Sequence, residues 1–289
     1  MNNLINYFVR EKIIKLIREY FYKQNFHEVI VPILNDALPI EKNLSPFTTT
    51  WNTLENKQTF FLPMSPERSL KIKLSQGIGN CFAIGHSFRN LENKGSLHNP
   101  EFLMLEWYRE NADYKKIMED VQELIKYLES SVGTTSFTSG VINWPVFSIA
   151  DMFKKYVKID MDDAIEKGEY DKLFVNEIES RLPNTPLFLI DFPSSISPLC
   201  QPQKNRPDLA ERFEFYINKI EMGNGNTENI DYKSVEKSFK SLRIENQPID
   251  NDFLNALKIM KSTGKSYAGI GVGIDRLAML FARISTINI

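Results

Sequence analysis

The sequence predicts an α+β fold in which an antiparallel β-sheet is flanked by helices. Two segments predict β-hairpins: residues 81–110, with apolar strands around a polar loop, and residues 213–228, with alternating strands around a short turn. Two others, residues 3–24 and 113–132, carry apolar side chains at the spacing of one helix face. Because a hairpin pairs its strands antiparallel, these segments predict such a sheet with helices packed on it.

Composition limits the classes of function. The chain has 289 residues, is 42% hydrophobic and 25% charged, and carries a formal net charge of −2. This length can bury a substantial core, and no repeat or linker divides it, so we expect a single domain over residues 1–289. The near-neutral charge gives no support to broad nucleic-acid binding. The two cysteines lack metal-ligand spacing, which favours a cytoplasmic setting, and no segment indicates export or a membrane span.

The first elements along the chain are a helix, a short strand and a long loop. The strand is broken by Pro32, which removes a ladder donor and so belongs at a sheet edge. Residues 36–59 have few periodic signals and are expected to form a loop over the site. A turn at Ser65 then leads into a helix whose first turn holds Glu67, where the helix dipole favours a carboxylate. The expected apolar face of the first helix comprises Ile5, Phe8, Val9, Ile13, Leu16, Ile17 and Tyr20.

The hairpin at residues 81–110 concentrates polar side chains beside buried aromatic residues. Strand alternation places Glu106 on one face with Phe102, Met104 and Tyr108. A carboxylate there needs a cationic partner, which a ligand could supply. Arg89 and His98, at the two ends of the loop, are natural phosphate ligands. The simpler alternative is a hairpin whose charged residues make surface ion pairs.

Two further stretches carry carboxylates and glycines. Glu214 and Glu221 lie near the ends of the hairpin at residues 213–228 and could form an oxygen site for Mg²⁺, although two solvated glutamates are the simpler alternative. Near the end of the chain, Gly269, Gly271 and Gly273 alternate, so one strand face lacks side chains and could accept a flat group. A Rossmann dinucleotide motif is excluded, because it needs a glycine three residues after Gly271, where the chain has Ile274.

These stretches resemble the motifs of one enzyme class. FRN followed by HNPEFLMLEWYRE resembles motif 2 of class II aminoacyl-tRNA synthetases, and within them lysyl-tRNA synthetase and its shorter paralogue, the elongation factor P lysine (β-lysyl) ligase family. The first helix and the strand ending at Pro32 resemble motif 1, and the glycine strand followed by Asp275 and Arg276 resembles motif 3. The resemblance implies the class II catalytic fold and a homodimer. It omits the anticodon-binding domain, because motif 1 begins almost at residue 1.

The resemblance also implies roles for individual residues. Arg89 would be catalytic at the α-phosphate and Arg276 on the nucleotide, where it would sandwich adenine with Phe102, while His98 would meet the γ-phosphate. Glu214 and Glu221 would hold Mg²⁺. The implied ATP site is Arg89, Glu92, His98, Phe102, Glu214, Gly273 and Arg276. The implied amino-acid site is Ser65, Glu67, Glu106, Tyr108, Glu221, Asn224, Glu228 and Gly271, with Gly225 giving backbone room.

Three positions depart from the family pattern. Leu91 stands where the family has glutamate, and the resemblance implies that Glu92 substitutes for it in a loop one residue longer. Asn226 replaces an aromatic residue. Gly271 is glycine, as in lysyl-tRNA synthetases, where the elongation factor P ligases tend to have alanine.

The implied function is ATP-dependent activation of lysine or β-lysine as an aminoacyl-adenylate, followed by transfer to a lysine of elongation factor P. One alternative is a free-standing lysyl-tRNA synthetase-like domain that charges tRNA or a small-molecule acceptor. Another is a non-catalytic paralogue that binds an amino acid.

Overall fold

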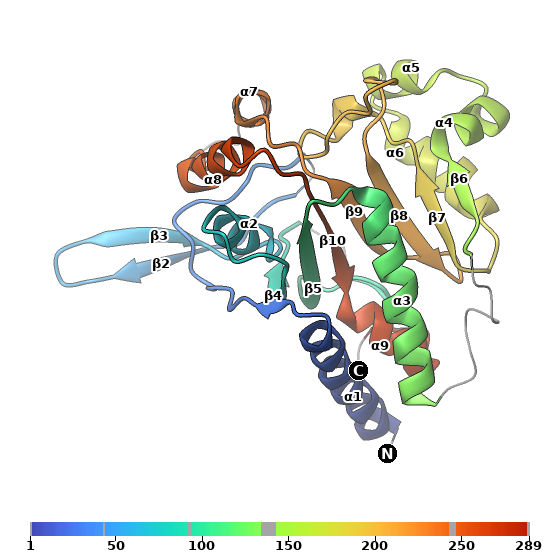
Figure 1. Ribbon diagram of the computed structural model, residues 1–289, viewed down its shortest axis with the longest axis horizontal. Helices are drawn as coiled ribbons and strands as arrows, with labels where there is room; N and C mark the ends of the chain where they lie inside the picture. The colour runs from blue at the N-terminus through green and yellow to red at the C-terminus, as the bar shows by residue number, and fades with distance from the viewer. Residues whose placement is uncertain (1, 43, 92–93, 134–142, 243–246, 288–289) are drawn as a thin grey trace.

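The computed structural model describes residues 2–42, 44–91, 94–133, 143–242 and 247–287. Its centre is an eight-stranded sheet in the order β1-β4-β5-β10-β9-β8-β7-β6 (Figure 1). Neighbours from β4 through to β7 pair antiparallel, whereas the two edge strands β1 and β6 pair parallel with β4 and β7. The predicted α+β class is confirmed. The strands of this sheet are β1 (His27–Glu28), β4 (Cys81–Phe88), β5 (Glu101–Glu110), β6 (Val146–Ser148), β7 (Leu187–Ile190), β8 (Arg212–Ile217), β9 (Ile220–Thr227) and β10 (Tyr267–Gly273).

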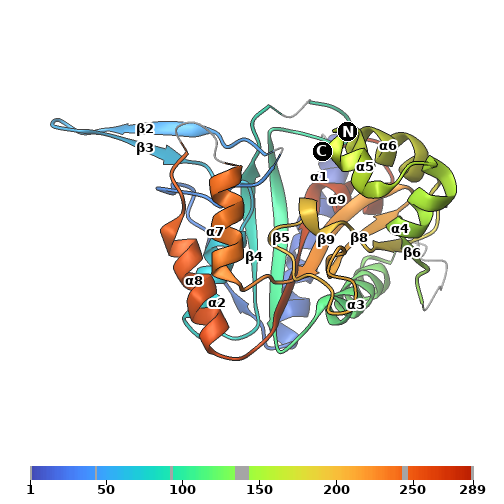
Figure 2. The same cartoon turned by 90° about the horizontal axis from the view of Figure 1, so that it is seen from above.

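Helices cover the two faces of the sheet unequally. Helices α1, α3 and α9 pack together over one face, and α2, α7 and α8 lie over the β4 end of the other (Figure 2). Helices α4, α5 and α6 pack over the β7 end of that second face, and a pocket lies between the two groups of helices. The helices are α1 (Asn2–Lys23), α2 (Glu67–Ser75), α3 (Tyr114–Val132), α4 (Ile149–Met152), α5 (Met161–Glu166), α6 (Tyr170–Leu173), α7 (Tyr232–Ser241), α8 (Asn251–Ser262) and α9 (Ile274–Ala282), with short helical turns at Phe153–Val157, Phe174–Ile178, Glu179–Arg181 and Ser194–Ile196. None of the helices in the described ranges is long and apolar enough to cross a membrane.

Both predicted hairpins are present. Strands β4 and β5 pair from Cys81 opposite Tyr108 to Phe88 opposite Glu101. Strands β8 and β9 are joined by Asn218 and Lys219, both with positive φ. This conformation matches the strand twist in a two-residue turn. The hairpins therefore bring two polar strand faces to one side of the sheet.

The sheet alternates between core and pocket as expected. Leu103, Leu105 and Trp107 of β5 are buried in the core beneath α1, α3 and α9. Tyr108, on the opposite face, packs in the second core with residues of α2 and α8. The apolar face predicted for α3 is likewise buried.

The prediction of the first helix is correct in its extent, but only part of the predicted apolar face is buried. Ile13 and Ile17 are fully buried, whereas Ile5 is 62% and Phe8 54% exposed. The N-terminal end of α1 projects beyond the sheet, so nothing in the described chain covers its first turns (Figure 1). Helical spacing reports which residues share a face but not how far the core beneath them extends.

The long loop predicted at residues 36–59 is partly wrong. Strands β2 (Thr48–Asn52) and β3 (Lys57–Phe61) form a separate two-stranded arm that leaves the body of the molecule (Figure 2). All five residues of β2 are exposed, so this strand lacks the apolar alternation by which strands are recognised. The Thr53 hydroxyl accepts a hydrogen bond from the Asn56 backbone N–H at 2.9 Å in the turn.

Candidate functional site

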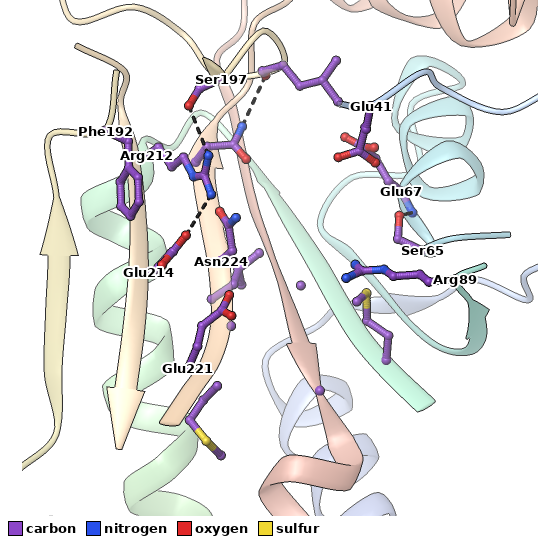
Figure 3. Close-up of a pocket in the computed structure, with 18 of the residues that line it drawn as sticks. Glu41, Ser65, Glu67, Arg89, Phe192, Ser197, Arg212, Glu214, Glu221 and Asn224 are labelled. Carbon is purple, nitrogen blue, oxygen red and sulfur yellow. Dashed lines mark hydrogen bonds and ion pairs between the residues drawn. The ribbon is translucent and has the colours of Figure 1, made fainter. Parts of the chain in front are cut away.

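A pocket of about 550 Å³ opens on the second face of the sheet, between the helices at its β4 end and those at its β7 end (Figure 3). Figure 3 shows two sides facing each other: Glu41, Ser65, Glu67 and Arg89 on one, and Arg212, Glu214, Asn224 and Glu221 on the other. The pocket brings together almost every residue predicted from the sequence. Those that line it are Ser65, Glu67, Arg89, His98, Phe102, Glu106, Tyr108, Glu214, Glu221, Asn224, Gly271, Gly273 and Arg276.

Glu106 is the most deeply buried carboxylate that lines the pocket. The residue is 4% exposed, and its Oε1 accepts a hydrogen bond from the Tyr108 hydroxyl at 2.6 Å. Its Oε2 has no hydrogen-bond partner among the described residues. Burial, followed by the nearby charge of Glu67, raises the pKa of Glu106 well above its usual value. This side chain is therefore poised to accept a hydrogen bond from a cationic group of a ligand.

Sequence reasoning gave no role to Lys71, which lies beneath this end of the pocket. The side chain is 1% exposed, and its ammonium donates to Glu67 Oε1 at 2.6 Å and pairs with Glu228. Burial alone would lower the pKa of Lys71, but Glu228 and Glu67 outweigh it and raise the pKa. The spacing of Glu67 and Lys71, four residues apart on a predicted helix, is the signal that could have revealed this pair.

Glu228 was expected in the substrate site but does not line the pocket. Its carboxylate is buried between Lys71 and Asn226, whose side-chain amide donates to Glu228 Oε1 at 3.1 Å. Asn226 does line the pocket. A direct role of Glu228 in binding a substrate therefore stays a prediction, whereas the structure gives it a supporting place behind Lys71.

Glu41 was also missed by sequence reasoning. It lies in the segment between β1 and β2, lines the pocket, and faces Glu67 in Figure 3. Burial and the charge of Glu67 raise the pKa of Glu41 to about 7. Only the placement of an acidic residue directly after the apolar Leu38 and Ile40 hinted at an anchored loop.

A second end of the pocket is rich in arginine. The Arg89 guanidinium lies 5.2 Å from the centroid of the Phe102 ring. Arg276, in the first turn of α9, donates to the Glu221 carbonyl at 2.6 Å and lies 3.0 Å from Nε2 of His98. Arg89 and Arg276, which are half-buried, and the exposed His98 carry nitrogen donors that suit phosphate oxygens. Their individual phosphate and adenine contacts stay predictions.

Glu214 and Glu221 come from the β8–β9 hairpin and line the same pocket. Glu214 accepts hydrogen bonds from Arg212 at 2.8 Å and from the Tyr216 hydroxyl at 2.9 Å. Burial and Glu221 raise the pKa of Glu214 to about 7. Glu221 pairs with Arg276 at 3.4 Å. Within the described ranges no group of three or more His, Cys, Asp or Glu side chains gathers as a metal cluster.

This donor set fits Mg²⁺ better than a metal that needs a complete protein cage. Two carboxylates offer hard oxygen ligands, and Mg²⁺ keeps several waters or phosphate oxygens as its remaining ligands. Sequence reasoning gave no role to Arg212, the first residue of β8. It holds Glu214, donates to the Ser197 hydroxyl at 3.2 Å, and stacks over Phe192.

The glycines serve different purposes. A Cβ on Gly271 would lie 3.3 Å from the Met104 sulfur and 4.0 Å from Glu106 Oε2, so this glycine widens the pocket beside Glu106. A Cβ on Gly225 would lie 2.7 Å from the Phe213 ring and 2.8 Å from the Gly269 carbonyl. The room that Gly225 provides is therefore used by the core rather than by a substrate. Glu92 lies outside the described residues.

The fold and the site together define a protein of the class II aminoacyl-tRNA synthetase type. The defining features are an antiparallel sheet, a hairpin with an arginine at the start of its loop, and a glycine strand that runs into an Asp-Arg helix. Comparison with known families agrees: residues 2–288 match the family described as tRNA synthetases class II (D, K and N), and the chain belongs to it.

Individual relatives fall into two named groups. The chain is 33% identical to a lysine–tRNA ligase of Methanoculleus marisnigri, over 94% of this chain and 59% of the relative. It is 34% identical to the lysine–tRNA ligase of Campylobacter jejuni, over 98% of this chain and 62% of the relative. It is 32% identical to the elongation factor P–(R)-β-lysine ligase of Buchnera aphidicola, over 96% of this chain and 92% of the relative. The chain thus spans about three fifths of these lysine–tRNA ligases and nearly all of the elongation factor P ligase.

Proposed function

We propose that the protein activates lysine or β-lysine with ATP, forms an aminoacyl-adenylate, and transfers the aminoacyl group to a lysine of elongation factor P. The observation that carries this proposal is Glu106, whose buried Oε2 is without a hydrogen-bond partner in the described chain and lies at the acidic end of the pocket. A buried carboxylate of this kind favours a cationic ligand, and the side-chain ammonium of lysine is one.

The proposed reaction needs no side-chain nucleophile. The carboxylate of the amino acid attacks the α-phosphorus of ATP in line, and pyrophosphate leaves. Arg89 would stabilise charge on the α-phosphate, and Arg276, held by the Glu221 carbonyl and by His98, would position the nucleotide. The acceptor amine then attacks the acyl carbon, and AMP leaves.

Glu214 and Glu221 are the residues that would hold Mg²⁺. When bound, this ion supplies positive charge to the phosphate oxygens of ATP. Arg212 would keep Glu214 oriented toward the ion, because its guanidinium holds one carboxylate oxygen at 2.8 Å.

The relatives support a protein acceptor and leave an alternative. One relative, 32% identical, is named an elongation factor P–(R)-β-lysine ligase, and two others, 33% and 34% identical, are named lysine–tRNA ligases. An alternative acceptor is tRNA or a small molecule. Gly271 favours lysine over β-lysine, because it leaves open space beside Glu106 where a methyl group would fill it.

Amino-acid-dependent ATP–pyrophosphate exchange tests this function. Purified protein with Mg²⁺ should support exchange with lysine or β-lysine and not with neutral amino acids. Transfer of labelled lysine to elongation factor P, compared with transfer to tRNA, then identifies the acceptor. Absence of exchange with every amino acid would contradict the proposal and favour a non-catalytic amino-acid-binding paralogue.

We further propose that residues 1–289 act as one catalytic domain in a cytoplasmic homodimer. Two observations support a self-association surface. Ile30, after β1, is 92% exposed beside the exposed Ile33 and Leu34, and Trp51 on the β2–β3 arm is 56% exposed. The cytoplasmic setting is supported separately, because both described cysteines are free thiols, as in a reducing compartment.

The homodimer has a direct test. Light scattering on the intact protein should give twice the chain mass, and Ile30→Glu should halve it.

A further inference from the structure

Glu41 is presented to the pocket by an anchored segment. Leu38 and Ile40, which precede it, are almost fully buried, and they pack in two different apolar clusters. The Gln247 side chain donates to the Leu38 carbonyl at 3.4 Å, and the Leu44 backbone N–H donates to the Glu41 carbonyl at 3.4 Å. The backbone on both sides of Glu41 is thereby held, so its side chain is directed by the fold and not by a free loop.

The Glu41 carboxylate meets a second carboxylate at the pocket surface. In Figure 3 the carboxylates of Glu41 and Glu67 point toward each other above Ser65 and Arg89. No hydrogen bond or ion pair holds the Glu41 carboxylate within the described residues, whereas Glu67 accepts from Lys71. Two neighbouring carboxylates repel each other, so a cation between them would be favoured.

Carboxylates outnumber cationic side chains at this end of the pocket, so a cationic ligand is favoured there. Within the described ranges, the buried ammonium of Lys71 pairs with Glu67 and Glu228, whereas Glu41 and Glu106 have no ion pair, and Arg89 lines the same pocket. Figure 3 shows Glu41 on the same side of the pocket as Arg89, the residue that would meet the α-phosphate. Glu106 accepts a hydrogen bond from Tyr108, which is buried in the core with residues of α2 and α8. Glu41 therefore lies toward the reacting end of the pocket and Glu106 toward its interior.

We propose that Glu41 is a specificity-determining residue that, together with Glu67, binds the ammonium group next to the reacting carboxylate of the substrate, while Glu106 binds the distal ammonium. This inference rests on the proposed function and assigns to it a residue that the motifs do not contain. The site then selects a diamino acid with an amine at each end, because each of two separate carboxylate groups needs its own cation.

Two ligands separate the roles of the two carboxylates. Lysine carries both amines, whereas 6-aminohexanoate has the same length and lacks the amine next to its carboxylate. Calorimetric titration of Glu41→Gln should show lysine binding weakened by about tenfold to a hundredfold, the range for a hydrogen bond to a charged group. Binding of 6-aminohexanoate should stay within about twofold of the unmodified protein.

Three matched variants control the experiment. Glu106→Gln should weaken both ligands, which shows that the titration detects loss of 6-aminohexanoate binding. Glu41→Asp keeps the charge and should recover part of the lysine affinity. Glu236→Gln, on an exposed helix position that pairs with Lys240, should change neither ligand. Thermal melting of each variant verifies that it is folded.

The outcomes distinguish this inference from the function on which it rests. Equal weakening of lysine and 6-aminohexanoate by Glu41→Gln, or no weakening of either, would overturn the role of Glu41 alone. Failure of the unmodified protein to bind lysine or β-lysine would overturn the proposed function, and this inference with it.

Discussion

The two sides of the pocket differ in how their carboxylates are balanced. On the side of β8 and β9, each carboxylate has its own arginine: Glu214 pairs with Arg212 at 2.8 Å and Glu221 with Arg276 at 3.4 Å. On the side of α2 and β5, several carboxylates share the ammonium of Lys71. On the first side the carboxylates and the arginines are equal in number, whereas on the second side the carboxylates outnumber the cationic side chains that pair with them.

The difference suggests that the two sides bind different parts of the substrates. When a balanced pair opens, its carboxylate can bind a metal ion and its arginine a phosphate oxygen. An excess of buried carboxylate favours a cationic ligand, which the amino acid of the proposed reaction would supply. In the proposed reaction, which needs no nucleophilic side chain, charge fixed before the substrates bind would be a main source of catalysis.

The largest expected effect comes from Arg89, which stands at the edge between the two sides. Arg89→Ala should lower the rate of ATP–pyrophosphate exchange by about 10³-fold, because charge on the reacting phosphate would lose its main donor. Lysine binding in the absence of ATP should change far less. A matched control is Arg206→Ala, whose exposed pair with Asp208 lies outside the pocket lining. Full activity in Arg89→Ala would contradict the assigned role.

Removing the shared ammonium tests the other side of the comparison. Lys71→Met should destabilise the protein by about 3 kcal/mol, because Glu67 and Glu228 would stay buried without a cation. Lys240→Met removes an exposed ammonium from a helix pair and should change stability by about 0.5 kcal/mol or less. Urea unfolding of both variants measures the difference. Similar stability of the two variants would mean that the buried carboxylates take up protons at little cost.

The acidic side should make two quantities change in opposite directions with pH: the stability of the ligand-free protein and its affinity for lysine. The pKa of Glu41 rises from 4.5 in the unfolded chain to about 7 in the fold. Between these values the folded protein binds more protons than the unfolded chain, so this group makes the ligand-free protein less stable as pH rises. Binding an ammonium needs the ionised carboxylate, so lysine affinity should increase over the same window, by at most about tenfold per pH unit for each proton released.

Melting curves with and without lysine measure both trends in one experiment. The ligand-free protein should lose stability from pH 4.5 to 7, and the stabilisation by lysine should grow over the same range. Lysine affinity that is flat with pH would show that the carboxylates are ionised throughout and would remove the distinction between the two sides.

Local sequence patterns were sufficient to predict the strands that form the pocket. Alternation along β5 placed Glu106 and Tyr108 opposite Leu105 and Trp107, and the structure agrees because period-two alternation is a property of the strand itself. The turn at Asn218 and Lys219 could likewise be predicted from the local sequence.

Contacts between distant segments could not be predicted in the same way. Glu41 lies 26 residues before Glu67, on a segment without periodicity, and only packing of the whole fold sets them side by side. The pairing of Lys71 with Glu228 joins α2 to the residue after β9, and no local pattern in the sequence indicates it. A direct role of Glu228 toward a substrate stays a prediction. Strand β2 and the first half of β3 were missed because their residues are exposed and carry no apolar alternation.

The smallest expected effect is on the balanced side, at Glu221. Its side chain is 37% exposed, so solvent screens its charge, and Arg276 remains held by the Glu221 backbone carbonyl after substitution. Glu221→Gln should therefore raise the Mg²⁺ concentration needed for half-maximal exchange by about tenfold. The KM for lysine should stay unchanged at saturating Mg²⁺. Glu106→Gln should give the reverse, a higher KM for lysine with an unchanged Mg²⁺ requirement. If both variants altered both quantities, the carboxylates would act as one electrostatic unit, and the division of the pocket into a metal side and an ammonium side would be wrong.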